Sequence, residues 1–149
     1  MTNGAGKIEF VNKALCEFAG RAPRELLGDI WMTLMHPDDA AGDIAERKRA
    51  WAAGRVPYAV EARFRRHDGQ WRWLAVSSNP RRDDKGAFRG YVGLAVDKTE
   101  AREALAVLKE SEERFRMMAD RAPVMIWMSD AQGQCLYLNA ALRNFWGVA

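Results

Sequence analysis

The residues best suited to chemistry are few, and the clearest group is His36-Pro37-Asp38-Asp39. A histidine beside two carboxylates could hold a metal ion. The same residues also describe a helix start, because proline fits the first helical position and acids stabilise the exposed N–H groups of the first turn. We favour the helix start and predict no metal site.

The remaining reactive residues form no recognisable catalytic set. Cys16 and Cys135 stand in no metal-ligand spacing, and no glycine-rich phosphate loop is present. We therefore expect this piece not to be an enzyme. Two cysteines without a pairing pattern fit a reducing, cytoplasmic setting.

Composition narrows the function classes further. The 149 residues are 48% hydrophobic and 29% charged, which is typical of a globular domain. No apolar run approaches the roughly 20 residues that span a bilayer, so we expect no membrane contact. The net charge of +3 comes from scattered bases interleaved with acids, which argues against a nucleic-acid partner.

The two ends of the chain have similar short sequences. Residues 6–20 align with residues 133–147 at an offset of 133 − 6 = 127, and six of the fifteen pairs are identical. A repeat of this length is a domain-sized unit. The chain is therefore expected to hold one nearly complete domain and the opening of a second.

Hydrophobic periodicity and turn residues place the elements between these ends. Strands are expected over residues 7–11, 58–65, 71–79, 88–96, 124–128 and 135–138. Helices are expected over residues 12–20, 23–28, 37–53 and 99–120. In the last helix, small or apolar residues recur at alternating spacings of three and four: Ala101, Ala104, Leu108, Ser111, Phe115 and Met118. This seam predicts either a coiled coil or a helix that lies on its own domain.

Several motifs in this order resemble the PAS sensory domain: Gly6…Phe10-Val11-Asn12, Glu25-Leu26-Leu27-Gly28, Trp31…His36-Pro37-Asp38-Asp39, the run from Glu61 to Trp73, and Gly90-Tyr91-Val92-Gly93 leading to Asp97-Lys98-Thr99. The resemblance implies an α+β fold, with a five-stranded antiparallel sheet, helices on one face and a pocket between them. Residues 1–98 would form the domain, 99–121 a linker helix and 122–149 the start of a second PAS copy.

Such a module resembles the sensor or relay units of bacterial signalling proteins, whose output domain is a histidine kinase or a diguanylate cyclase. A constitutive dimerisation scaffold and a flavin-dependent redox sensor remain as alternatives. In the family an Asp-Ile-Thr motif joins the last strand to the exit helix. Here Asp97 and Thr99 match it, either as a signal junction or as an ordinary helix cap, while Lys98 replaces the isoleucine.

No cofactor is predicted. The flavin-photoreceptor branch of the family uses a cysteine in a Gly-x-Asn-Cys setting, and the haem branch uses a histidine on the long helix; this chain has neither. A flavin or a small apolar ligand stays open, because four aromatic residues could line a pocket or simply fill the core: Trp31, Trp51, Phe64 and Trp73.

The first copy has only five residues before Gly6, so we expect it to lack the central strand that residues 124–128 supply in the second copy. An unfilled central position exposes unpaired strand edges. The helix from Thr99 would carry Val124–Met128 roughly 33 Å away, which predicts that two chains exchange this strand as a homodimer.

Overall fold

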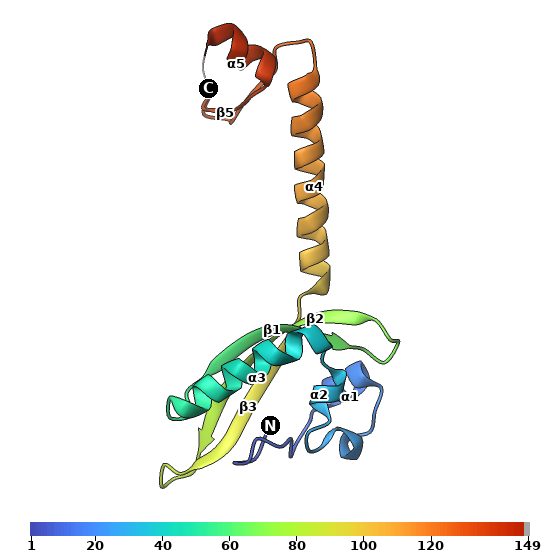
Figure 1. The fold of residues 1–149 in the computed structure, drawn as a ribbon, viewed down its shortest axis with the longest axis vertical. Coiled ribbons are helices and arrows are strands. Elements are labelled where there is room, and N and C mark those ends of the chain that lie inside the picture. The colour runs from blue at the N-terminus through green and yellow to red at the C-terminus, as the bar shows by residue number, and fades with distance from the viewer. Residues whose placement is uncertain (148–149) are drawn as a thin grey trace. The chain divides into compact units, whose positions relative to one another are not determined.

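The computed structural model describes residues 1–147 and divides into two compact units, Met1–Glu100 and Ala101–Ala149 (Figure 1). None of the helices in the described part of the chain is both long enough and apolar enough to cross a membrane.

The first unit is built on a three-stranded antiparallel sheet in the order β1-β2-β3. Its strands are β1 (Tyr58–Arg65), β2 (Trp71–Arg82) and β3 (Phe88–Asp97). The Asp-Gly turn between β1 and β2 forms as the sequence predicts, because Asp68 Oδ1 accepts the Gln70 N–H at 3.0 Å and Gly69 adopts φ 85°.

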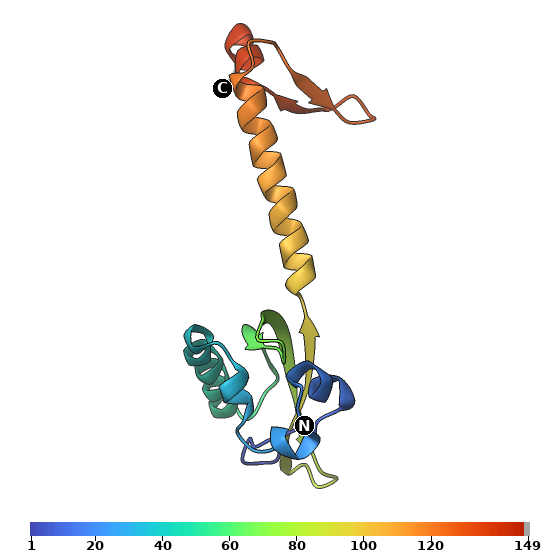
Figure 2. The same ribbon diagram turned by 90° about the vertical axis from the view of Figure 1, so that its right-hand side faces the viewer.

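Four helical elements precede this sheet in the chain: α1 (Lys13–Ala19), the 3-10 turn η1 (Pro23–Leu26), α2 (Trp31–Leu34) and α3 (Pro37–Ala52). Figures 1 and 2 show α3 lying along the sheet, and it packs on β1. The helix start expected at His36 is confirmed, since His36 is the N-cap and its ring accepts the Asp38 N–H. Ala19 of α1, Leu26 of η1 and Leu34 of α2 pack together as a buried hydrophobic cluster.

Of the four strands expected within residues 1–98, three form, and with the helices they confirm the α+β class. The five-stranded sheet that the resemblance implies is therefore present only in part. The segment 7–11 is not a continuous strand, because Ile8 makes only isolated bridges to Thr2 and Gly28. A ladder needs consecutive paired residues on a neighbouring strand. Within the described part of the chain, the main-chain hydrogen bonds of this segment run to residues 1–3 and to Gly28.

The second unit contains most of α4 (Thr99–Arg121), followed by β4 (Trp127–Ser129), β5 (Cys135–Leu138) and α5 (Ala140–Trp146). The strand expected at residues 124–128 is shifted to Trp127–Ser129. The reason is that the Asn139 side chain binds the Val124 carbonyl and the Ile126 N–H, which therefore cannot enter a strand ladder.

The internal repeat is visible in the backbone. Asn12 and Asn139 cap α1 and α5, and their side chains accept N–H groups three residues on, from Leu15 and Leu142. Gly20 ends α1 at φ 64° and ψ 32°, and Gly147 ends α5 at φ 67° and ψ 29°. The helices of the two copies and their caps therefore have the same local shape, whereas residues 135–138 form a strand and their counterparts before Asn12 do not.

Candidate functional site

The junction between β3 and α4 is fastened to the neighbouring strand β2. Thr99, the first residue of α4, is 5% exposed, and its Oγ1 accepts the Trp73 N–H at 2.8 Å. The Lys98 N–H donates to the Trp73 carbonyl, also at 2.8 Å. The hydrogen bonds of the sheet therefore continue without interruption into the first turn of the helix.

Asp97 completes this junction from the end of β3. Its Oδ1 accepts the Thr99 N–H at 2.9 Å, and its Oδ2 accepts Arg72 Nε at 2.9 Å. Partial burial would raise the pKa of Asp97, but the hydrogen bonds from Thr99 and Arg72 outweigh it and lower that pKa. Arg72 also lies 3.6 Å from Glu100, so one guanidinium joins β2 to both sides of the junction.

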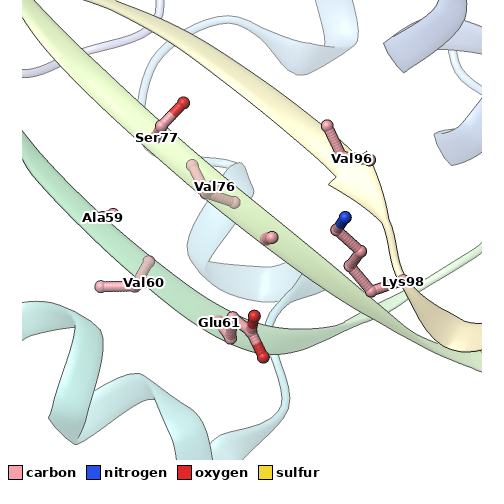
Figure 3. A pocket seen from close by; sticks show the side chains of 8 residues that line it. Ala59, Val60, Glu61, Val76, Ser77, Val96 and Lys98 are labelled. Carbon is pink, nitrogen blue, oxygen red and sulfur yellow. The ribbon is translucent and has the colours of Figure 1, made fainter. Parts of the chain in front are cut away.

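Lys98, which stands where the family pattern has an apolar residue, is exposed at this junction. It lines a shallow apolar hollow of about 300 Å³ on the sheet (Figure 3). Val96 lies beside it, and Glu61 comes from β1. The other lining residues are Ala59, Val60, Ala75, Val76 and Ser77.

A second hollow, of about 320 Å³, lies between α3 and the N-terminal loop. Trp31 and Trp51 line it, and the Arg47 guanidinium lies 4.1 Å from the centre of the Trp31 ring. Arg47 also donates to the Gly6 carbonyl at 3.5 Å. Two indole rings beside a guanidinium could hold a flat ligand that carries negative charge, and the volume falls at the lower end of ligand pockets.

The four aromatic pocket candidates do not line one cavity. Trp31 and Trp51 share the second hollow, whereas Phe64 packs against the buried core of Ala19, Leu26 and Leu34. Trp73 lies on β2, with the Arg63 guanidinium 5.4 Å from its ring centre. Two of the four candidates therefore line one hollow together, and the other two pack elsewhere.

Arg47 was missed by the sequence reasoning, although its position carried a signal. Asp43, Arg47 and Trp51 follow one another at spacings of four on α3, which places them on one face of the helix. Asp43 is 6% exposed, and its Oδ2 has no hydrogen-bond partner among the described residues. Burial raises the pKa of this carboxyl, and the charge of Arg47 opposes that rise.

Within residues 1–147, no three histidine, cysteine or acidic side chains are placed to hold a metal ion. At the junction, hydrogen bonds connect the sheet to the first turn of α4. The two hollows are candidate binding surfaces.

Comparison with known proteins relates the chain to a family. Residues 8–95 match a family model described as PAS fold, and residues 113–149 match one described as PAS domain. The C4-dicarboxylate transport sensor protein DctS of Rhodobacter capsulatus is 33% identical over 73% of this chain and 17% of its own length. The two-component sensor PprA of Pseudomonas aeruginosa is 34% identical over 80% of this chain and 13% of its own length.

A further relative, the uncharacterized protein y4lL of Sinorhizobium fredii, is 39% identical over 78% of this chain and 14% of its length. The chain thus spans less than a fifth of each of these three relatives.

Solved structures share the fold. The N-terminal domain of a diguanylate cyclase with PAS/PAC sensor from Marinobacter aquaeolei gives a TM-score of 0.58 at 20% identity, over 66% of this chain and 90% of that one. The PAS domain of a Colwellia psychrerythraea protein gives 0.57 at 22% identity, over 66% and 83%. With a family model matching more than half of its residues, the chain belongs to the PAS family.

Proposed function

We propose that this chain is a sensory or relay module of a larger bacterial signalling protein, and that the signal passes from the sheet into α4 through Asp97 and Thr99. The observation that carries the proposal is the bond between Thr99 Oγ1 and the Trp73 N–H. A rearrangement of β2 would act directly on the first turn of α4 through this bond and through Arg72.

The surface of α4 supports a role in transmission. Side chains from Ala101 to Met118 are exposed within the second unit, including Leu105, Leu108 and Met118 at 66%, 65% and 67%. Apolar side chains at this spacing favour a partner helix. We propose that α4 delivers the signal to a second helix or to the output domain.

The names of the relatives support the class of parent protein. Two of them are named as sensors, and a structural neighbour is part of a diguanylate cyclase. A histidine kinase or a diguanylate cyclase is therefore the output domain that we propose. We propose the hollow beside Trp31 and Trp51 as the site at which this module receives its signal.

The test is the substitution Thr99→Val, which keeps the shape of the side chain and removes the acceptor for the Trp73 N–H. We expect amide hydrogen exchange to accelerate by about fivefold at Trp73 and in residues 99–103, which corresponds to a loss of roughly 1 kcal/mol. Exchange in the middle of β1 should not change.

Thr33→Val is the matched control. Thr33 is exposed and donates to the Ile30 carbonyl inside a short helix, away from the junction. If Thr99→Val and Thr33→Val leave the protection of α4 equally unchanged, the junction does not couple the sheet to the helix and the proposal fails.

A further inference from the structure

One edge of β3 is open. Within residues 1–147, β2 covers one side of β3, while on the other side only Thr2 binds it as a strand would. The Thr2 N–H donates to the Tyr91 carbonyl at 2.8 Å, and the Tyr91 N–H donates to Thr2 Oγ1 at 2.9 Å. Because peptide groups alternate along a strand, Gly93 and Ala95 point their N–H groups to this same edge.

The open edge is also apolar. Val92, Leu94 and Val96 are 39%, 67% and 52% exposed, and residues 92–96 carry no charge. An uncharged edge strand with exposed apolar residues favours pairing with another strand.

The repeat shows which kind of strand belongs beside this edge. At the offset of 127, Thr2 corresponds to Ser129, and the bridge from Thr2 to Ile8 corresponds to the pair of Ser129 with Cys135. The following turns are equivalent too, since the Oδ1 atoms of Asn3 and Asp130 each accept N–H groups two and four residues on. Met1-Thr2 therefore occupies the position of Met128-Ser129, the end of a longer strand.

In the second unit, the residues before this position are held by Asn139. Its Nδ2 donates to the carbonyls of Ala119 and Val124, both at 2.8 Å, and its Oδ1 accepts the Ile126 N–H at 2.9 Å. Asn139 is completely buried. Asn12, its counterpart in the first unit, is exposed, and its side chain caps α1 by accepting the Leu15 N–H at 3.0 Å.

We propose that Val124–Ser129 of a second copy of this chain replaces Met1-Thr2 beside β3, and that the two copies exchange this segment reciprocally. Asn12 then holds the incoming Val124 and Ile126 as Asn139 does in the second unit. Ser129 supplies a hydroxyl in the place of the Thr2 hydroxyl that binds Tyr91.

The contacts of the N-terminal segment define the direction and register of this pairing. A Cβ on Gly90 would meet Thr2 and Asn3, and a Cβ on Gly4 would meet the Phe88 carbonyl, so this segment runs antiparallel to β3. With Ser129 opposite Tyr91, Trp127 lies opposite Gly93, Ile126 opposite Leu94 and Met125 opposite Ala95. The N–H groups of Met125 and Trp127 then meet the open edge, while that of Ile126 meets Asn12.

The length of α4 requires that the strand come from another molecule. The helix has 23 residues and is about 34 Å long, and only Ala122 and Pro123 separate it from Val124. The open edge of β3 ends two residues before α4 begins. An intact α4 therefore keeps the segment from reaching the β3 of its own chain.

Exchange breaks the pairing of β4 with β5, in which Trp127 lies opposite Leu138 and Met128 opposite Tyr137. Residues 8–11, the counterparts of β5 in the repeat, take the place of β5 beside the incoming strand. Equivalents of the Asn139 bonds re-form at Asn12, and β3 adds main-chain bonds at Gly93 and Ala95. The segment itself is uncharged, and its exposed residues include Val124, Trp127 and Met128 at 56%, 66% and 43%, so no charge is buried on pairing.

Disulfide trapping tests the register. In a Cys16→Ser, Cys135→Ser background, Leu94→Cys with Ile126→Cys should form a disulfide between chains, because such a pair of residues faces at about 4.5 Å between Cα atoms. The matched control is Leu94→Cys with Val124→Cys, which is two residues out of register and should cross-link at least about tenfold more slowly. A disulfide within one chain, or equal rates for both pairs, overturns the proposal.

Light scattering after gel filtration tests the edge. The 149-residue chain should be a dimer, and Ala95→Pro should make it a monomer, since proline removes an edge-facing N–H and leaves the bonds to β2. Ala95→Thr keeps that N–H and should remain dimeric. A monomeric parent chain, or a dimer that Ala95→Pro leaves intact, contradicts the exchange.

The two asparagines provide a second matched pair. Asn139→Ala releases the segment from its own unit and should raise the dimer fraction at a given concentration, whereas Asn12→Ala removes the acceptor for the incoming Ile126 and should lower it. Far-UV circular dichroism checks that the sheet is retained. Shifts of the same sign for both variants count against the proposal.

Discussion

Two aspartates one helical turn apart on α3 show how environment, rather than residue type, sets the behaviour of a side chain. Hydrogen bonds from Arg63 lower the pKa of Asp39. Burial raises the pKa of Asp43, whose Oδ2 has no partner among the described residues. The folded state therefore favours the charged form of the first and disfavours the charged form of the second.

Asp43→Asn should stabilise the protein at neutral pH. Because the folded pKa of Asp43 is raised, ionisation costs folding free energy at pH values above that pKa, and an amide avoids this cost. We expect the free energy of unfolding to rise by about 1 kcal/mol at pH 7. The gain should disappear below the ordinary aspartate value of 3.8, where Asp43 is protonated in both states.

Urea titrations at pH 7 and pH 3.5 measure this difference, and Asp84→Asn, at an exposed site, serves as the control. A destabilised Asp43→Asn protein at both pH values would mean that the carboxylate has a stabilising partner.

At the scale of elements, one ion pair attaches the start of α3 to β1. Asp39 accepts three hydrogen bonds from Arg63, from its N–H, Nε and Nη2 at 2.7, 2.9 and 2.7 Å. The Asp39 side chain is 15% exposed, whereas the neighbouring Asp38 is 74% exposed and lies 3.5 Å from the same guanidinium. A bidentate, shielded pair is the kind that contributes to stability.

Asp39→Ala should lower the free energy of unfolding by about 2 kcal/mol, because it leaves Arg63 without its main partner. Asp38→Ala should change it by less than about 0.5 kcal/mol. The Asp39 contribution is fully present above the ordinary pKa of 3.8 and is lost as the pH falls through the lowered folded value. Denaturant curves from pH 7 down to pH 2.5 follow this loss; equal effects of the two substitutions would contradict it.

Elements with local signals could be predicted from the sequence. The Asp-Gly hairpin and the helix start at His36 depend on bonds between residues a few positions apart. Segments whose neighbours come from elsewhere were placed less well. Residues 7–11 make bridges rather than a strand, and residues 124–126 bind the distant Asn139.

The candidate site shows the same division. Asp97 and Thr99 followed from a short motif and lie together at the junction. Trp73 and Phe64 were grouped with Trp31 and Trp51 by residue type alone, but the register of the sheet and the core place them elsewhere. Arg47 lines the same hollow as Trp51, because residues four apart lie on one face of α3. Grouping the residues of α3 by helical face would have identified it from the sequence.

At the scale of the whole molecule, the chain consists of two compact units, each with its own buried residues. Leu26 is 1% exposed in the core of the first unit, and Leu142 is 4% exposed in the second. When strand exchange is blocked, for example by Ala95→Pro, damage to one core should stay in that unit.

In that background, Leu26→Ala should destabilise residues 1–98 by about 3 kcal/mol, the usual cost of a cavity in a core. Hydrogen exchange measured by mass spectrometry should show faster exchange there and unchanged exchange in residues 124–147. Equal acceleration in both units would show that they unfold together.

The two equivalent turns, at Asn3 and at Asp130, have a consequence for how such proteins grow. A gene segment of 127 codons cut at this position could be inserted again without altering the backbone on either side of the splice. Arrays of any number of sensors could then arise by unequal recombination, with every added copy receiving a ready-made connecting helix.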